Sequence, residues 1–179
     1  HTGDSFPFES RQIPFLNWIF GLNTTGENTD YYLLINKEYE TLAVTFKLLS
    51  EKELLNKSQN KYILWGLLFG LTILIVLINI FIWLATKDVI FIYFLGVIIT
   101  SAIHILGATG LGFQYIWPLF PVINSWFPQT FSLWINLIFQ LVFLQYFIGQ
   151  TPQNSKIYFW IKYFIYSIVF ALVLFVIFH

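Results

Sequence analysis

Polar side chains at helical spacing are the first candidates for chemistry in this chain of 179 residues. Ser132, Asn136 and Gln140 fall at i, i+4 and i+8, so they share one face of a helix. A row of hydroxyl and amide groups can line a path for a ligand or a proton. Uncharged amides more often form hydrogen bonds between helices, worth roughly 1 kcal/mol each or less. We expect this row to point into a helix bundle.

Two further polar residues, Asn79 and His104, lie within apolar runs of the sequence. Each costs free energy in hydrocarbon unless it faces a partner. A histidine near a membrane surface can titrate in the physiological range and sense pH. A neutral, hydrogen-bonded imidazole is the simpler expectation. No carboxylate lies within the apolar runs, which argues against a pump or an ion-coupled transporter.

No recognisable catalytic arrangement accompanies these residues. The sequence has no Gly-x-Ser-x-Gly elbow, no His-Glu-x-x-His pair and no Gly-Lys-Ser/Thr phosphate loop, and His1, His104 and His179 are far apart. The chain also lacks cysteine, which excludes disulfides, a thiolate nucleophile and Cys-ligated zinc. We therefore expect no enzymatic activity, no cofactor and no metal site within this chain.

Composition indicates a membrane protein. The chain is 58% hydrophobic and 21% aromatic, more than a soluble domain of this size can hide. Its formal net charge is zero and its lysines are scattered, so nothing predicts a nucleic-acid partner. The lipid bilayer is the expected environment.

Four apolar runs are long enough to cross a hydrocarbon core of roughly 30 Å, which needs about 20 helical residues. Ser50 and Glu53 fit a capping box, which predicts that the first helix begins near Glu51. We predict a transmembrane region at 51–179, with helices at about 51–84, 89–107, 129–149 and 157–178. The pair Gly66 and Gly70 has the spacing of a helix-dimer motif and favours a homodimer.

The links between the helices indicate orientation. Lys87 follows the first helix, and Lys156 and Lys162 surround the third link, whereas 111–128 carries no charge. The positive-inside rule then places the first and third links in the cytoplasm and the head, residues 1–50, outside. Three lysines just before the first helix oppose this assignment: Lys52, Lys57 and Lys61.

The head carries strand signals. Aromatic and β-branched residues fill 15–22, a polar turn precedes 31–36, and apolar residues alternate along 41–48. We expect an antiparallel sheet, the last strands of a larger sandwich truncated upstream. Trp18 can stack on a sugar ring or pack in the core. Arg11 can clamp a ligand or donate structural hydrogen bonds.

One combination of motifs resembles a known family. The uncharged aromatic string Gly110 to Pro118 includes Gln114, Tyr115 and Trp117, and can serve as an interfacial anchor. Three other elements stand at matching order and spacing: Asn79 with Phe81, Lys87-Asp88, and Tyr93. Together they resemble the bacterial seven-transmembrane receptors with diverse intracellular signalling modules. Ile78 and Lys87 depart from the Tyr and Arg that the family often has there.

The head resembles the end of that family's second type of extracellular domain, a jelly-roll sandwich similar to carbohydrate-binding modules. The resemblance rests on Thr2-Gly3-Asp4, Pro7-Phe8, Arg11, Ile13-Pro14, Phe20 and Leu22. It implies an all-α helical membrane bundle, four helices of an expected seven, preceded by β-strands of an extracytoplasmic sandwich. It also implies a multi-pass receptor of the bacterial inner membrane with its head periplasmic or extracellular.

The leading hypothesis is therefore a fragment of a sensory receptor. A small molecule or carbohydrate is the implied ligand, and a histidine kinase or diguanylate cyclase outside this chain is the implied type of output module. A small transporter or channel subunit and a membrane anchor for a partner protein are the alternatives. The candidate ligand or signalling residues are Arg11, Trp18, Asn79, His104, Gln114, Tyr115, Trp117, Asn136 and Gln140.

Overall fold

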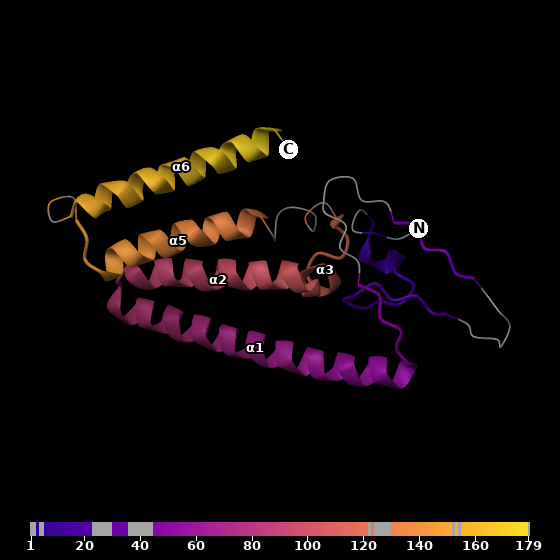
Figure 1. Cartoon of the computed structure of the whole chain (residues 1–179). Coiled ribbons are helices and arrows are strands. Elements are labelled where there is room, and N and C mark those ends of the chain that lie inside the picture. The colour runs from indigo at the N-terminus through magenta and orange to yellow at the C-terminus, as the bar shows by residue number, and fades with distance from the viewer. Residues whose placement is uncertain are drawn as a thin grey trace.

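The computed structural model describes residues 3, 6–22, 30–35, 45–121, 123, 130–151, 153 and 155–178. Its elements are the short helix η1 (Phe8–Ser10) and the helices α1 (Glu51–Thr86), α2 (Ile90–Thr109), α3 (Leu111–Tyr115), α5 (Ser132–Phe147) and α6 (Lys156–Phe178). The four long helices run alternately in opposite directions, in the order α1, α2, α5, α6 across the bundle (Figure 1). Residues 6–22, here called the head segment, lie at the end that carries α3.

Local sequence explains where α1 begins and ends. Ser50 Oγ accepts a hydrogen bond from Glu53 N at 3.3 Å, and Glu53 Oε2 accepts one from Ser50 N at 3.4 Å. This is the capping box that the sequence predicts. Lys87 ends the helix in the left-handed conformation, with φ 56°. Asp88 Oδ1 then accepts a hydrogen bond from Ile90 N and starts α2.

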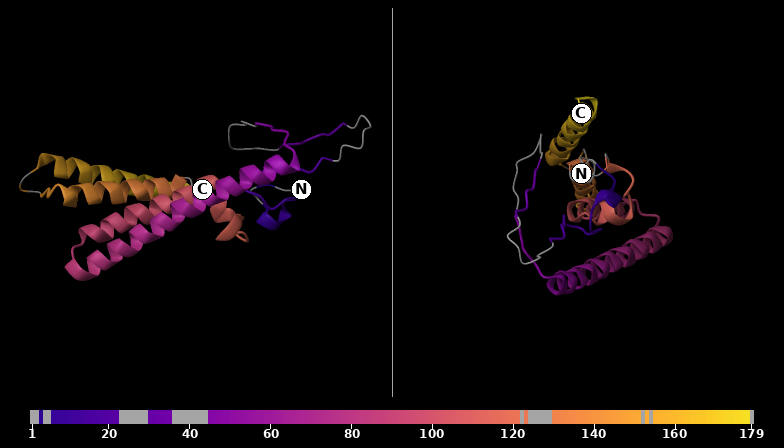
Figure 2. Two further views of the ribbon diagram at one scale, coloured as in Figure 1. Left: turned by 90° about the horizontal axis from the view of Figure 1, so that it is seen from below. Right: turned by 90° about the vertical axis from the view of Figure 1, so that its right-hand side faces the viewer.

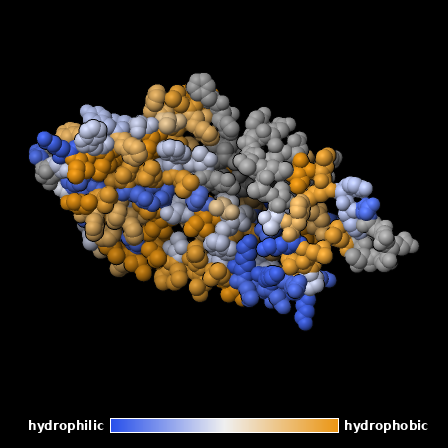
Figure 3. Space-filling view, viewed as in Figure 1, coloured by the Kyte–Doolittle hydropathy of each residue, from blue (hydrophilic) through white to orange (hydrophobic). Residues whose placement is uncertain are grey.

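Three helices of the described residues are long and apolar enough to cross a membrane: α1, α2 and α6. Helix α5 has 16 residues, about 24 Å, which is shorter than the hydrocarbon core. Most of the face seen in Figure 3 is hydrophobic, with hydrophilic residues at the N-terminal end of α1. Large side chains such as Leu67 and Phe170 are exposed on the bundle. The structure is that of a multi-pass membrane protein.

The expected β-sandwich is wrong for the residues that the structure describes, because none of them lies in a strand. Residues 15–22, 31–35 and 45–48 have no regular secondary structure, and 36 and 41–44 fall outside the described residues. The apolar side chains of the first stretch pack elsewhere: Leu16 is buried, and Phe15 contacts Tyr62 of α1. The side chains of Tyr32 and Leu34 are 92% and 94% exposed, so they do not form the buried face of a sheet.

The tightest apolar packing lies at the end of the bundle next to the head segment, called the head end below. Five apolar side chains are buried among the described residues, and four of them meet there: Phe8, Leu16, Leu111 and Phe113. The fifth, Ile168, lies in α6. The right-hand view of Figure 2 looks onto this end and shows the head segment in front of α2 and α3, with α1 apart. The head segment is therefore packed onto the bundle.

Candidate functional site

Gly110 positions α3 for its contact with the head segment. Gly110 stands between the last residue of α2 and the first residue of α3, and its φ is +78°. Residues that carry a Cβ rarely adopt this backbone conformation. Leu16 O lies 3.5 Å from the point where a Cβ would stand. The sharp turn between α2 and α3 thus lets the head segment's backbone approach closely.

Phe8 joins the head segment to α3 and the residues after it. Its backbone N donates a hydrogen bond to Pro118 O at 3.1 Å. Its ring meets the ring of Phe113 edge to face, with 5.5 Å between centroids and 86° between planes. Edge-to-face pairs of this kind add about 0.5–1.5 kcal/mol to the gain from burial. Phe113 is 1% exposed, so this pair forms the centre of the contact.

Arg11 holds the head segment in shape. Its Nη1 donates hydrogen bonds to Phe15 O at 2.6 Å and Leu16 O at 3.1 Å. The guanidinium lies 3.9 Å from the ring centroid of Trp18 and 4.6 Å from that of Phe8. A planar guanidinium suits this place because it can stack on rings and donate in its own plane at once. Arg11 thereby fixes a turn that presents Phe8 and Leu16 to α3.

A second contact links the head segment to α1. The ring of Phe15 meets that of Tyr62 edge to face, with 5.9 Å between centroids. Tyr62 Oη donates a hydrogen bond to Gln114 Oε1 at 3.0 Å. Three elements, the head segment, α1 and α3, therefore meet through Phe15, Tyr62 and Gln114. We call the contacts of Phe8, Arg11, Phe15, Leu16, Trp18, Tyr62, Phe113 and Gln114 the head junction.

Trp117 and Tyr115 complete the surroundings of α3. The Trp117 ring covers Gly112 so closely that a Cβ there would overlap it. The Trp117 Nε1 atom is buried and has no hydrogen-bond partner among the described residues. Tyr115 is 65% exposed. Trp117 thus packs closely on α3, whereas the Tyr115 side chain is largely accessible.

A second group of polar residues joins α2 to α5. Asn136 Nδ2 lies 2.9 Å from Val97 O, 2.8 Å from Thr100 Oγ1 and 2.8 Å from Ser101 Oγ. The amide has two protons for these three acceptors, so at most two ordinary bonds form at once. Gln140 Nε2 donates to Asn136 Oδ1 at 2.6 Å. The Asn136 amide is thus fully engaged between the two helices.

The remaining polar candidates differ in their hydrogen-bond partners. Ser132 Oγ and His104 Nδ1 lie 3.3 Å apart, which extends the contact between α2 and α5 by one turn. Ser132 is buried, as is Asn136, whereas Gln140 is exposed. Asn79 is buried, but its Nδ2 donates to Ile75 O of its own helix at 2.8 Å. Asn79 therefore stands apart from both groups.

Apart from Asn79, the structure places the sequence candidates in two groups. Arg11, Trp18 and Gln114 belong to the head junction, and Tyr115 and Trp117 flank it, whereas His104, Asn136 and Gln140 belong to the contact of α2 with α5. No group of three potential metal-ligating side chains occurs in the described ranges. Sequence reasoning missed Phe8, Phe113 and Tyr62 as site residues. Phe8 and Phe113 stood in two separate motifs of the family resemblance, whereas Tyr62 stood in neither.

The sequence of the bundle matches a known family. Residues 61–179 match the family model for 7TM diverse intracellular signalling. The chain belongs to this family. No curated protein and no solved structure matches it. The matched residues include α2, α3, α5 and α6 and most of α1, whereas the head segment lies before them. Membership in the 7TM diverse intracellular signalling family identifies the bundle as the membrane part of a signalling protein.

Proposed function

We propose that this chain senses a small molecule on its head side and passes a conformational signal through its helices to a cytoplasmic output module. Membership in the signalling family supports the receptor class. We propose further that the chain acts in a bacterial inner membrane with the head side outward, works as a homodimer and performs no catalysis itself. Because the described head residues form no sandwich, the proposed ligand class is no narrower than a small molecule.

The head junction is the observation that carries this proposal. A receptor needs contact between the part that meets the ligand and the helices that cross the membrane. Here Phe8 packs on Phe113 of α3, and Phe15 packs on Tyr62 of α1. The head segment therefore touches the membrane helix α1 directly and reaches α2 through α3 and Gly110, so it can bias the position of α1 relative to α2.

The two contacts respond differently to a movement of the head segment. The contact with α3 is buried and hydrogen-bonded, so α3 and α2 should follow the head segment as one unit. The head segment's contact with α1 is the single ring pair of Phe15 with the half-buried Tyr62, so it can slide or break. The hydrogen bond of Tyr62 goes to Gln114 of α3 instead. Signalling of this kind requires two arrangements that the ligand stabilises unequally. We propose that they differ in the separation of α1 from α2 at the head end.

Spin labels can test whether Arg11 holds the junction together. The chain contains no cysteine, so Glu9→Cys and Tyr115→Cys supply the only labelling sites, one on η1 and one on α3. Both residues are exposed. Arg11→Ala removes two hydrogen bonds and the stacking on Trp18, and should broaden the distance distribution and lengthen its mean. Pulsed electron paramagnetic resonance measures this distribution.

Gln12→Ala is the matched control. Gln12 is the neighbouring residue, and its Oε1 accepts one exposed hydrogen bond from Gly21 N. This variant should leave the label distances as they are in the parent chain. Equal distributions in the parent chain and in Arg11→Ala would contradict the role given to the junction.

A further inference from the structure

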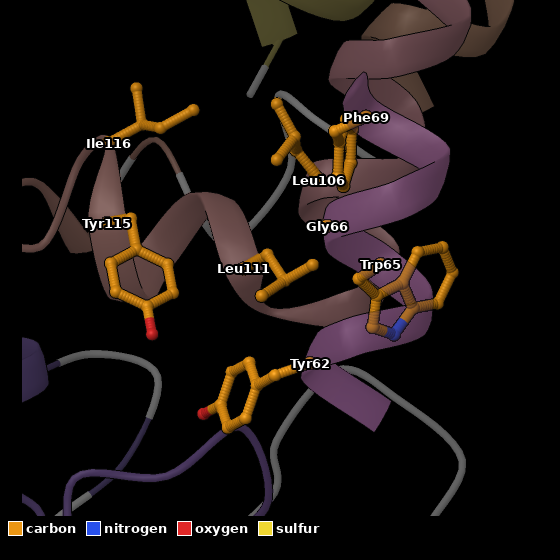
Figure 4. Close-up of a pocket in the computed structure, with 8 residues that line it drawn as sticks. All are labelled: Tyr62, Trp65, Gly66, Phe69, Leu106, Leu111, Tyr115 and Ile116. Carbon is orange, nitrogen blue, oxygen red and sulfur yellow. The ribbon is translucent and has the colours of Figure 1, made fainter. Parts of the chain in front are cut away.

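An apolar groove opens between α1 and α3 at the head end. Its volume is about 220 Å³. Tyr62, Trp65 and Phe69 of α1 form one wall, and Leu106, Leu111 and Tyr115 face them (Figure 4). The groove lies beside α1 and α2, two helices that are long and apolar enough to cross a membrane.

The size and lining of the groove restrict its occupant. Pockets for drug-sized ligands usually measure about 300–1,000 Å³ and contain several placed polar groups. This groove is smaller, its floor is leucine, and the Tyr62 hydroxyl already donates to Gln114. A sugar in this groove would lose its hydrogen bonds with water and gain few with the protein. A narrow hydrocarbon chain matches both the volume and the lining.

The aromatic lining of the groove is typical of a membrane interface. Tyr62, Trp65 and Tyr115 are of the residue types that gather at membrane interfaces. Lys61 directly precedes Tyr62 and stands one helical turn, about 6 Å, above Trp65. Lys61 forms no ion pair with the described residues, and its half-buried stem can run along the helix while its ammonium reaches the headgroups.

We propose that the groove binds one acyl chain of an anionic glycerophospholipid from the head-side leaflet, with the net-negative headgroup at Lys61. The apolar walls select the chain, and the lysine charge favours a headgroup whose phosphate is not neutralised by a choline ammonium. This site does not depend on the proposed sensory function, but it requires that the proposed homodimer leave the Gly66 face of α1 uncovered.

Two glycines of α1 allow a matched test of the groove. A Cβ at Gly66 or at Gly70 would meet nothing within 4 Å, so either position accepts a larger side chain without a clash at its Cβ. Gly66 lines the groove, whereas Gly70, one turn further along, does not. Gly66→Leu should therefore fill the groove, and Gly70→Leu should leave it open.

The lysine has a matched control of its own. Lys61→Gln removes the charge at the groove, and Lys52→Gln removes the same charge about 13 Å further up the same helix. A lysine near an anionic lipid surface is worth roughly a fivefold change in binding. Only Lys61→Gln should change the preference for anionic over zwitterionic lipid by about that factor.

The experiment uses the whole chain reconstituted in vesicles of equal parts phosphatidylglycerol and phosphatidylcholine with identical acyl chains. Native mass spectrometry after mild detergent extraction counts the lipids that each chain retains. The parent chain, Gly70→Leu and Lys52→Gln should retain one phosphatidylglycerol in several-fold excess over phosphatidylcholine. Gly66→Leu should lose the retained lipid, and Lys61→Gln should keep a lipid with the preference largely lost.

Three results would overturn the proposal. The first is equal retention of the two lipids by the parent chain. The second is a retained lipid in Gly66→Leu that matches the one in Gly70→Leu. The third is a dimer of the parent chain that both glycine variants dissociate, because this face would then be covered by a second copy rather than by lipid.

Discussion

Helix α2 packs closely against α5 along its length but diverges from α1 towards the head end. Towards α5 the packing is close: the Phe139 ring lies against Gly96, and Asn136 Nδ2 lies within hydrogen-bond distance of three acceptors of α2. Towards α1 the helices are joined by a short turn at Lys87 and Asp88 and separate towards the head end, where the groove opens (Figure 1). We interpret α2 and α5 as a fixed pair and α1 as a helix that can pivot on its turn. The head segment contacts both parts, so it is placed to move one relative to the other.

The largest expected effect comes from breaking the fixed pair. Gly96→Leu would place its Cβ against the Phe139 ring at overlapping distance, so the ring or the two helices must shift. Overpacking of this kind typically costs up to about 3 kcal/mol. We expect a loss of that size in the free energy of unfolding, measured by SDS titration in mixed micelles and followed by tryptophan fluorescence.

Gly66→Leu is the control for this substitution on the other side of the bundle. Its Cβ meets nothing within 4 Å, so its unfolding free energy should stay within about 0.5 kcal/mol of the parent value. Equal losses in the two variants would show that α1 and α5 are held equally tightly, and would remove the basis of the comparison.

A smaller effect should follow from removing the polar link between α2 and α5. Asn136→Leu deletes the amide that reaches Val97, Thr100 and Ser101. Hydrogen bonds between membrane helices are worth roughly 0.6 kcal/mol on average, so a loss of about 1 kcal/mol is expected in the same titration. Gln140→Leu, at an exposed position with one partner, should cost less.

The same two variants address the transporter alternative. If Asn136 and Gln140 line a path for a solute, the double variant should abolish solute flux into vesicles while the chain still folds. We expect no such flux from the parent chain, because the Asn136 amide is committed to bonds between the helices. A flux that disappears in the double variant would contradict the receptor proposal.

The smallest effect concerns the turn on which α1 pivots. Lys87 adopts φ 56°, which a residue with a Cβ enters at a cost of about 1 kcal/mol or more, so Lys87→Gly should relieve strain. The change also removes the lysine ammonium from its place 5.5 Å from the Trp83 ring centroid, which is worth roughly 0.5 kcal/mol. We expect a net gain of about 0.5 kcal/mol. A clear loss in the SDS titration would mean that Trp83 and Lys87 hold the turn.

The sequence was informative where a local rule decides the structure. Run length and hydropathy predicted apolar helices that cross a membrane, and the Ser50 to Glu53 spacing predicted how α1 begins. The i, i+4 spacing placed Ser132 and Asn136 on one face, and both are buried against α2. These features depend on residues within a few helical turns of each other.

The sequence did not predict the contacts between segments that are far apart along the chain. Residues 15–22 have strand composition, but Leu16 and Phe15 bury against α3 and α1 instead of a neighbouring strand. The pairing of Phe8 with Phe113 joins residues more than a hundred positions apart, and no periodicity predicts it. The groove arises from the angle between α1 and α2, which packing of the whole bundle sets.

The central claim is that the head segment controls the separation of α1 from α2 at the head end. Spin labels at Leu64 of α1 and Ala108 of α2, both exposed, measure that separation directly, and labels at Ala108 and Leu133 measure α2 against α5. With Arg11→Ala we predict that the first distance distribution shifts or broadens while the second stays unchanged. The claim would be contradicted if both distributions stayed unchanged in Arg11→Ala while the labels at Glu9 and Tyr115 showed that the head segment had moved away from α3.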